Sequence, residues 1–220
     1  MKLQSSTKRI LSLSYKCLII LLAVTGILLQ CEIGTSSFSL SSFRMFTTLS
    51  NLAVAVFYLA YVTAELRMPG CAENSVKFGY FKFLITMSIM LTGLVAYFML
   101  RGMFDGMDAI VKAGLVLLHD VVPIGTFLDW VLFNAKGKTT WKTPLYATVF
   151  PIVYVIVSMI AAQFLTGDGK YPYPFLNVDL LGAGAVALNI LLLAIAFLAV
   201  GYLGVAIDHA LGRRKRHERA

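Results

Sequence analysis

A histidine and an aspartate stand side by side within a long apolar stretch of this sequence. They lie in LVLLHDVVP, residues 115–123, where Asp120 follows His119 and Pro123 comes four residues after the histidine. Buried polar groups cost free energy unless they find partners, and histidine is the usual general base near neutral pH. Because proline has no N–H to donate, the His119 carbonyl also loses its helical partner. This stretch is the first candidate for a chemical site.

A second polar group lies in FRMFTTLSNLAVAV, residues 43–56. Four small polar residues crowd into about one helical turn: Thr47, Thr48, Ser50 and Asn51. A threonine hydroxyl becomes a nucleophile when a base takes its proton, so a pair of Thr48 and His119 would suit acyl transfer. A helix that begins near Phe38 rather than Phe43 puts both residues at the same depth, about 15 Å. Helix packing is the alternative interpretation of this group, because small polar residues often join membrane helices.

The elements that would position these residues are membrane helices. Hydrophobic residues make up 59% of the 220 residues and charged residues only 14%, whereas soluble domains carry roughly 25% charged residues. Apolar runs of about 18 residues indicate membrane spans. The connections are short and no internal repeat is visible, so we expect one all-α domain over residues 1–220, a polytopic six-helix bundle with a basic tail at 209–220. The expected helices cover about 15–29, 43–64, 83–100, 109–133, 144–165 and 181–207.

The basic residues predict the orientation of the bundle. With six helices both termini share one side, and fifteen of the nineteen basic residues fall there; the other four are Arg44, Arg101, Lys112 and Lys170. Positively charged loops stay cytoplasmic, so both termini are predicted to face the cytoplasm from the cell membrane. The net charge of +8 then requires no nucleic acid. The tail is expected to act as a topology signal, with anionic lipid headgroups as the alternative partner.

Other polar residues fall within or beside the expected helices. Steps of seven residues place Lys112, His119 and Thr126 on one face of the helix over 109–133, with Asp120 about 100° away. Ionisable groups inside a membrane are functional candidates by default. Near the end of that helix, Asp129 is expected to snorkel to the interface. Asn189 is expected to form a hydrogen bond between helices.

The connection GDGKYPYPFLNVD, residues 167–179, is the most elaborate loop in the sequence. Its two prolines force extended backbone on the tyrosines that precede them. The loop would either anchor in lipid headgroups or cover the mouth of a polar cavity between the helices over 43–64, 109–133 and 181–207. The candidates for lining that cavity are Lys112, Thr126, Tyr173, Asn177 and Asn189. The three cysteines lie far apart, so no disulfide follows, and neither a metal nor another cofactor is implied.

Three blocks in this order carry a resemblance to known families: FTTLSNL, LHDVVPIGTFLDWVLF and KYPYPFLNVDLLG. Together they resemble a family of small bacterial integral membrane proteins with six helices. More distantly, they are similar to the eukaryotic androgen-induced membrane protein family, whose members are threonine hydrolases that cleave fatty acid esters of hydroxy fatty acids. In that family the threonine lies three residues before an acidic residue and a leucine. Asn51-Leu52 takes that place here and matches Thr48.

The resemblance implies an intramembrane hydrolase of a lipid ester. Thr48 would attack the carbonyl, His119 would accept and return the proton, and Asn51 would donate to the oxyanion, with Asp120 as an orienting residue. The loop at 167–179 would gate access of the lipid substrate. Two other classes stay open: a transporter or binding protein whose polar path is lined by His119 and Asp120, and a scaffold whose polar residues only join helices.

Overall fold

The computed structural model is predominantly helical in the part of the chain that it describes, and it has no strand there. The backbone is described for residues 2–33, 38–167 and 169–217, and the side chains for those positions between residues 6 and 213. Within these described residues, six helical segments are long and apolar enough to cross a membrane: Ser6–Gln30, Phe46–Arg67, Val76–Met103, Ala109–Phe133, Thr143–Phe164 and Val178–Arg213. The predicted all-α, six-helix fold of a multi-pass membrane protein is confirmed.

Several spans contain more than one helix. The α-helices are α1 (Lys2–Gln30), α2 (Phe46–Arg67), α3 (Val76–Val95), α4 (Ala109–Val116), α5 (Val122–Phe133), α6 (Thr143–Ala147), α7 (Val149–Ala161) and α8 (Val178–His217). Two π turns continue or join them: Ala96–Leu100 extends α3, and Leu117–Val121 joins α4 to α5. Short 3-10 turns cover Leu40–Arg44, Arg101–Met103, Ala162–Phe164 and Pro174–Leu176.

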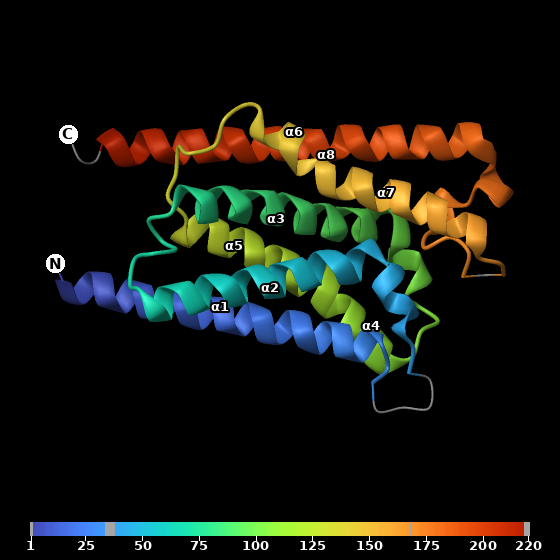
Figure 1. Cartoon of the computed structure of the whole chain (residues 1–220), viewed down its shortest axis with the longest axis horizontal. Helices are drawn as coiled ribbons and strands as arrows, with labels where there is room; N and C mark the ends of the chain where they lie inside the picture. The colour runs from blue at the N-terminus through green and yellow to red at the C-terminus, as the bar shows by residue number, and fades with distance from the viewer. Residues whose placement is uncertain (1, 34–37, 168, 218–220) are drawn as a thin grey trace.

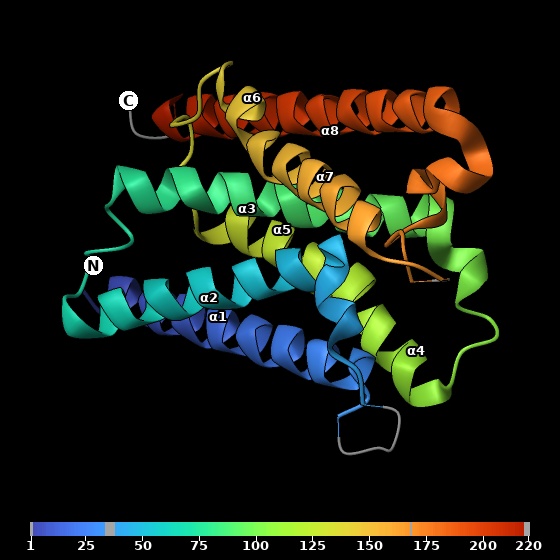
Figure 2. The ribbon, with the colours of Figure 1, turned by 45° about the vertical axis from the view of Figure 1, so that its right-hand side comes forward.

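The helices form three groups in the bundle. Helices α3 and α5 lie in the middle, α1 and α2 pack on one side, and α6, α7 and α8 lie on the other (Figures 1 and 2). The first helix begins and the last helix ends at the same end of the bundle (Figure 1). Long apolar side chains are exposed along the outer faces of the helices, as a lipid environment requires because lipid rather than water surrounds those faces.

Two helix ends differ from the sequence prediction in ways that matter for the site. The second span begins at Phe46, after a 3-10 turn and the extended residue Met45, rather than at Phe43 or Phe38. The last span begins at Val178 and bends at Gly182, whose φ of 78° and ψ of 155° are not helical. Side chains rarely tolerate such a conformation, so glycine permits this bend. The bend joins the loop at 167–177 to the long part of α8.

Candidate active site

A threonine and a histidine from different helices meet inside the bundle, and the threonine is Thr47. Its Oγ1 lies 2.9 Å from Nε2 of His119, and both residues are buried, with 3% and 4% of their surface exposed. The other ring nitrogen, Nδ1, lies 2.9 Å from the Leu115 carbonyl oxygen. A carbonyl only accepts, so Nδ1 carries a hydrogen and Nε2 of the neutral ring accepts the Thr47 hydroxyl hydrogen. This tautomer can take a proton from Thr47.

The prediction that Thr48 pairs with His119 is wrong. Thr48 is buried, but its hydroxyl donates to the Gln30 side chain at the end of α1, over 3.3 Å. Adjacent residues on a helix point about 100° apart, so only one of the two threonines can face His119. Helix α2 begins at Phe46, which places its first turn beside the middle of the α4–α5 span and brings Thr47 to the histidine.

A π turn holds His119 in this position. Within Leu117–Val121 the N–H of Val122 donates to the Leu117 carbonyl, five residues back, rather than to Leu118. The π register would next use the N–H of residue 123, which is a proline and has none. The Leu118 carbonyl is therefore left without a backbone donor. Pro123 thus disturbs the helix as predicted. The carbonyl that it leaves without a helical donor is that of Leu118, the residue before His119.

Asn51 supplies the missing donor and is not free to bind an oxyanion. Its amide nitrogen donates to the Leu118 carbonyl over 3.1 Å and to the Thr47 carbonyl over 2.8 Å. An amide group has two N–H donors, and both are used. Asn51 thus ties the first turn of α2 to the π turn that carries His119, and the predicted oxyanion role is corrected to a positioning role.

Tyr173 of the loop after α7 reaches the same threonine. Its hydroxyl lies 3.3 Å from the Thr47 backbone nitrogen and 3.3 Å from Thr47 Oγ1. Because the Thr47 hydroxyl hydrogen is directed at His119, Tyr173 accepts from the Thr47 N–H and donates to Oγ1. Burial raises the pKa of the Tyr173 phenol, which keeps this donor protonated. The sequence motif YPYPF thus contributes a side chain to the site from a distant part of the chain.

A cavity of about 240 Å³ opens beside Thr47. Its walls come from the first turn of α2, the end of α3 and its π turn, helices α7 and α8, and the loop at 173–176. The cavity was predicted to be polar and to involve the helix over 109–133, but its described lining contains no charged residue and is mostly aliphatic and aromatic. Ile152 and Ile156 of α7 line it while 50% and 52% exposed, so the cavity opens laterally between α7 and α8.

Two predicted ionisable members of the site lie outside it. Asp120 is 32% exposed at its side chain and forms an ion pair with Arg101 over 3.3 Å. Lys112 is exposed and pairs with Asp105 over 3.5 Å. Neither contact touches His119, so the face shared by Lys112 and His119 on an ideal helix does not become a continuous polar path. The π turn at Leu117–Val121 rotates less per residue than an α-helix, so it shifts His119 from the face that an ideal helix would give it.

Three other residues predicted to line the cavity lie outside its lining. Asn177 accepts the N–H of Leu180 and so caps the start of α8. Asn189 donates to the Phe175 carbonyl over 3.0 Å and fastens the loop that carries Tyr173. Thr126 is buried beside Tyr58 on the other side of the bundle. Asn177 and Asn189 thus support the fold beside the cavity rather than line it.

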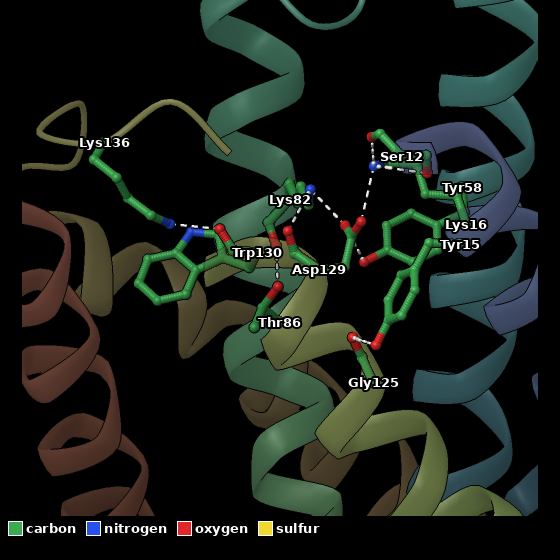
Figure 3. A network of polar contacts seen from close by, with 10 residues as sticks. All are labelled: Ser12, Tyr15, Lys16, Tyr58, Lys82, Thr86, Gly125, Asp129, Trp130 and Lys136. Carbon is green, nitrogen blue, oxygen red and sulfur yellow. Dashed lines mark hydrogen bonds and ion pairs between the residues drawn. The ribbon is translucent and has the colours of Figure 1, made fainter. Parts of the chain in front are cut away.

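A second polar centre surrounds Asp129 (Figure 3). The Asp129 carboxylate contacts Lys16 over 2.8 Å and Lys82 over 2.5 Å, and accepts the Tyr58 hydroxyl over 2.8 Å. All four side chains are buried, so the expectation that Asp129 snorkels to the interface is wrong. Lys16 and Lys82 lie at the ends of apolar runs in the sequence. Their position there does not indicate whether their side chains point into the bundle or towards the membrane interface.

An apolar layer separates the two polar centres. It contains Ile19, Ala23, Val54, Ile89 and Val122, all buried. The Thr47–His119 pair and the Asp129 cluster are therefore distinct sites within one bundle. No protein-family model, no curated protein and no solved structure matches this chain.

Proposed function

We propose that the protein is an intramembrane lipid ester hydrolase in which Thr47, rather than Thr48, is the nucleophile and His119 is its base. The observation that carries this proposal is the 2.9 Å contact between Thr47 Oγ1 and His119 Nε2, with His119 Nδ1 bonded to the Leu115 carbonyl. Nucleophile, base and orienting group are then all within hydrogen-bond reach, as activation of a hydroxyl requires.

The first half of the reaction uses three groups that already meet. Thr47 Oγ1 attacks the ester carbonyl carbon while its proton passes to His119 Nε2. The carbonyl oxygen becomes an oxyanion that accepts the Thr47 N–H and the Tyr173 hydroxyl, which lie 3.3 Å apart. Donors aimed at developing charge stabilise such an intermediate strongly in a dry site. His119 then returns the proton to the departing alcohol, leaving an acyl-threonine ester that water hydrolyses in the second half.

The cavity supports a lipid as the substrate. Its aliphatic and aromatic walls suit an acyl chain, and its lateral opening between α7 and α8 faces the region where bilayer lipids lie. The resemblance to threonine hydrolases indicates fatty acid esters of hydroxy fatty acids as the substrate type. The basic residues near the end of the bundle where both termini lie support a cell-membrane location with cytoplasmic termini.

Covalent labelling tests the proposed nucleophile. A fluorophosphonate probe should label the purified protein, and labelling should be lost in Thr47→Ala and reduced by at least about 100-fold in His119→Ala, the lower range for a lost general base. Thr48→Ala is the matched control, because its hydroxyl contacts Gln30, and it should label normally. Peptide mass mapping should locate the adduct on Thr47.

Other outcomes would assign the protein to another class. Labelling that survives Thr47→Ala contradicts the nucleophile assignment. No labelling, together with pH-dependent flux in liposomes that vanishes in Asp120→Asn, would instead establish the transport alternative. The surface pairing of Asp120 with Arg101 and the apolar layer between the polar centres favour the hydrolase.

A further inference from the structure

The cavity beside Thr47 offers few places to hold a water molecule. Among the described residues, its lining contains five hydroxyl groups, on Thr47, Thr92, Thr148, Tyr154 and Tyr173. Each of them has a hydrogen-bond partner within the protein, so none is an idle donor. A buried water needs two to four polar partners, and apolar cavities stay dry.

This property bears on the second half of the proposed reaction. An acyl group on Thr47 must be removed by a hydroxyl compound that reaches His119 Nε2 through the same space. Water entering an apolar cavity leaves its hydrogen bonds behind, whereas a lipid alcohol brings apolar chains that the walls accommodate. The opening beside Ile152 and Ile156 faces lipid, so the acceptor available at highest local concentration is another membrane lipid.

We propose that the protein transfers the acyl group from Thr47 to the hydroxyl of a second membrane lipid, and therefore acts as a lipid transacylase with hydrolysis as the minor route. This inference rests on the proposed function, because it requires the acyl-threonine intermediate. It goes further by naming the acceptor as a neutral, apolar lipid alcohol.

The transfer step requires no reactant other than the acylated protein and the acceptor lipid alcohol. The acceptor hydroxyl oxygen forms a bond to the acyl carbon while its proton passes to His119 Nε2. The bond between the acyl carbon and Thr47 Oγ1 then breaks, and His119 returns the proton to Thr47. One ester is consumed and another is formed, so the enzyme ends in its starting state.

Partition between two products tests the inference. The purified protein is reconstituted in phosphatidylcholine liposomes with a fluorescent fatty acyl ester as donor and dioleoylglycerol as acceptor. Mass spectrometry then measures triacylglycerol and free fatty acid, together with acyl-Thr47 on the tryptic peptide. We expect triacylglycerol to exceed free fatty acid, and both products to be lost in Thr47→Ala.

A change in cavity polarity supplies a second test. Val155→Asn adds an amide to the lining and should shift the products several-fold towards free fatty acid, because the amide can hold a water. Val157→Asn, on an exposed part of the same helix, is the matched control and should leave the ratio unchanged.

Failure of the transacylase inference and failure of the hydrolase proposal would give different results. Free fatty acid alone, with acyl-Thr47 detected, overturns the transacylase inference and leaves the hydrolase proposal standing. Absence of both products and of acyl-Thr47 overturns both. A product ratio that Val155→Asn leaves unchanged contradicts dryness of the cavity as the cause of the partition.

Discussion

Replacement of Asn51 by leucine should loosen the helix that carries His119. Asn51 donates to the Leu118 carbonyl over 3.1 Å and to the Thr47 carbonyl over 2.8 Å. Leu118 has no backbone donor to fall back on, because the Val122 N–H is committed to Leu117 and residue 123 is a proline. A buried acceptor left unsatisfied costs about 1–3 kcal/mol, and leucine has a similar size, so packing loss should add little.

The predicted loss of stability is thus about 1–3 kcal/mol, which is a factor of about 5 to 150 in the unfolding equilibrium. Unfolding in mixed micelles with increasing dodecyl sulfate, followed by circular dichroism, measures it. Labelling of Thr47 by the fluorophosphonate probe should fall as well, since the π turn no longer holds His119 against α2.

Thr48→Val is the control for the Asn51 variant, because it removes a neighbouring buried hydroxyl whose partner is the Gln30 side chain. It should cost less stability and leave labelling intact. The reasoning is refuted if Asn51→Leu keeps both the stability and the labelling rate of the unchanged protein, since the Leu118 carbonyl would then not depend on this amide.

Three further predictions follow from other contacts. Asp129→Asn should destabilise the protein by about 3–5 kcal/mol, because it leaves two buried lysines without their carboxylate, and Lys82→Met should cost less in the same micelle unfolding assay. Gly93→Ala should lower both stability and probe labelling, because the added Cβ would lie 2.8 Å from the His119 carbonyl oxygen. Burial raises the pKa of Tyr173, so a difference titration against Tyr173→Phe at 295 nm should show less phenolate from this residue at pH 10 than the half ionisation of an ordinary tyrosine.

The number and type of the elements could be predicted from the sequence because they depend on local properties. A run of about 18 apolar residues can satisfy its backbone in lipid only as a helix, whatever its neighbours are. His119 could also be identified from the sequence as a candidate site residue, because a titratable side chain in an apolar run needs a partner. The proline after it predicted a local disturbance, and the π turn over Leu117–Val121 is that disturbance.

The partners of these residues were decided by tertiary structure. Thr47 and Thr48 are chemically identical neighbours, and the choice between them depends on where α2 begins and how it is rotated against α5. The contact of Tyr173 with Thr47 joins positions 126 residues apart, and no local pattern encodes it. The sequence likewise places three charged residues near the ends of apolar runs, as expected for the membrane interface: Lys16, Lys82 and Asp129. In the structure they point into the bundle from three helices and form ion pairs there. The hydropathy of the sequence predicts which segments lie in the membrane. The direction of a side chain and the identity of its neighbour are determined only when the helices pack.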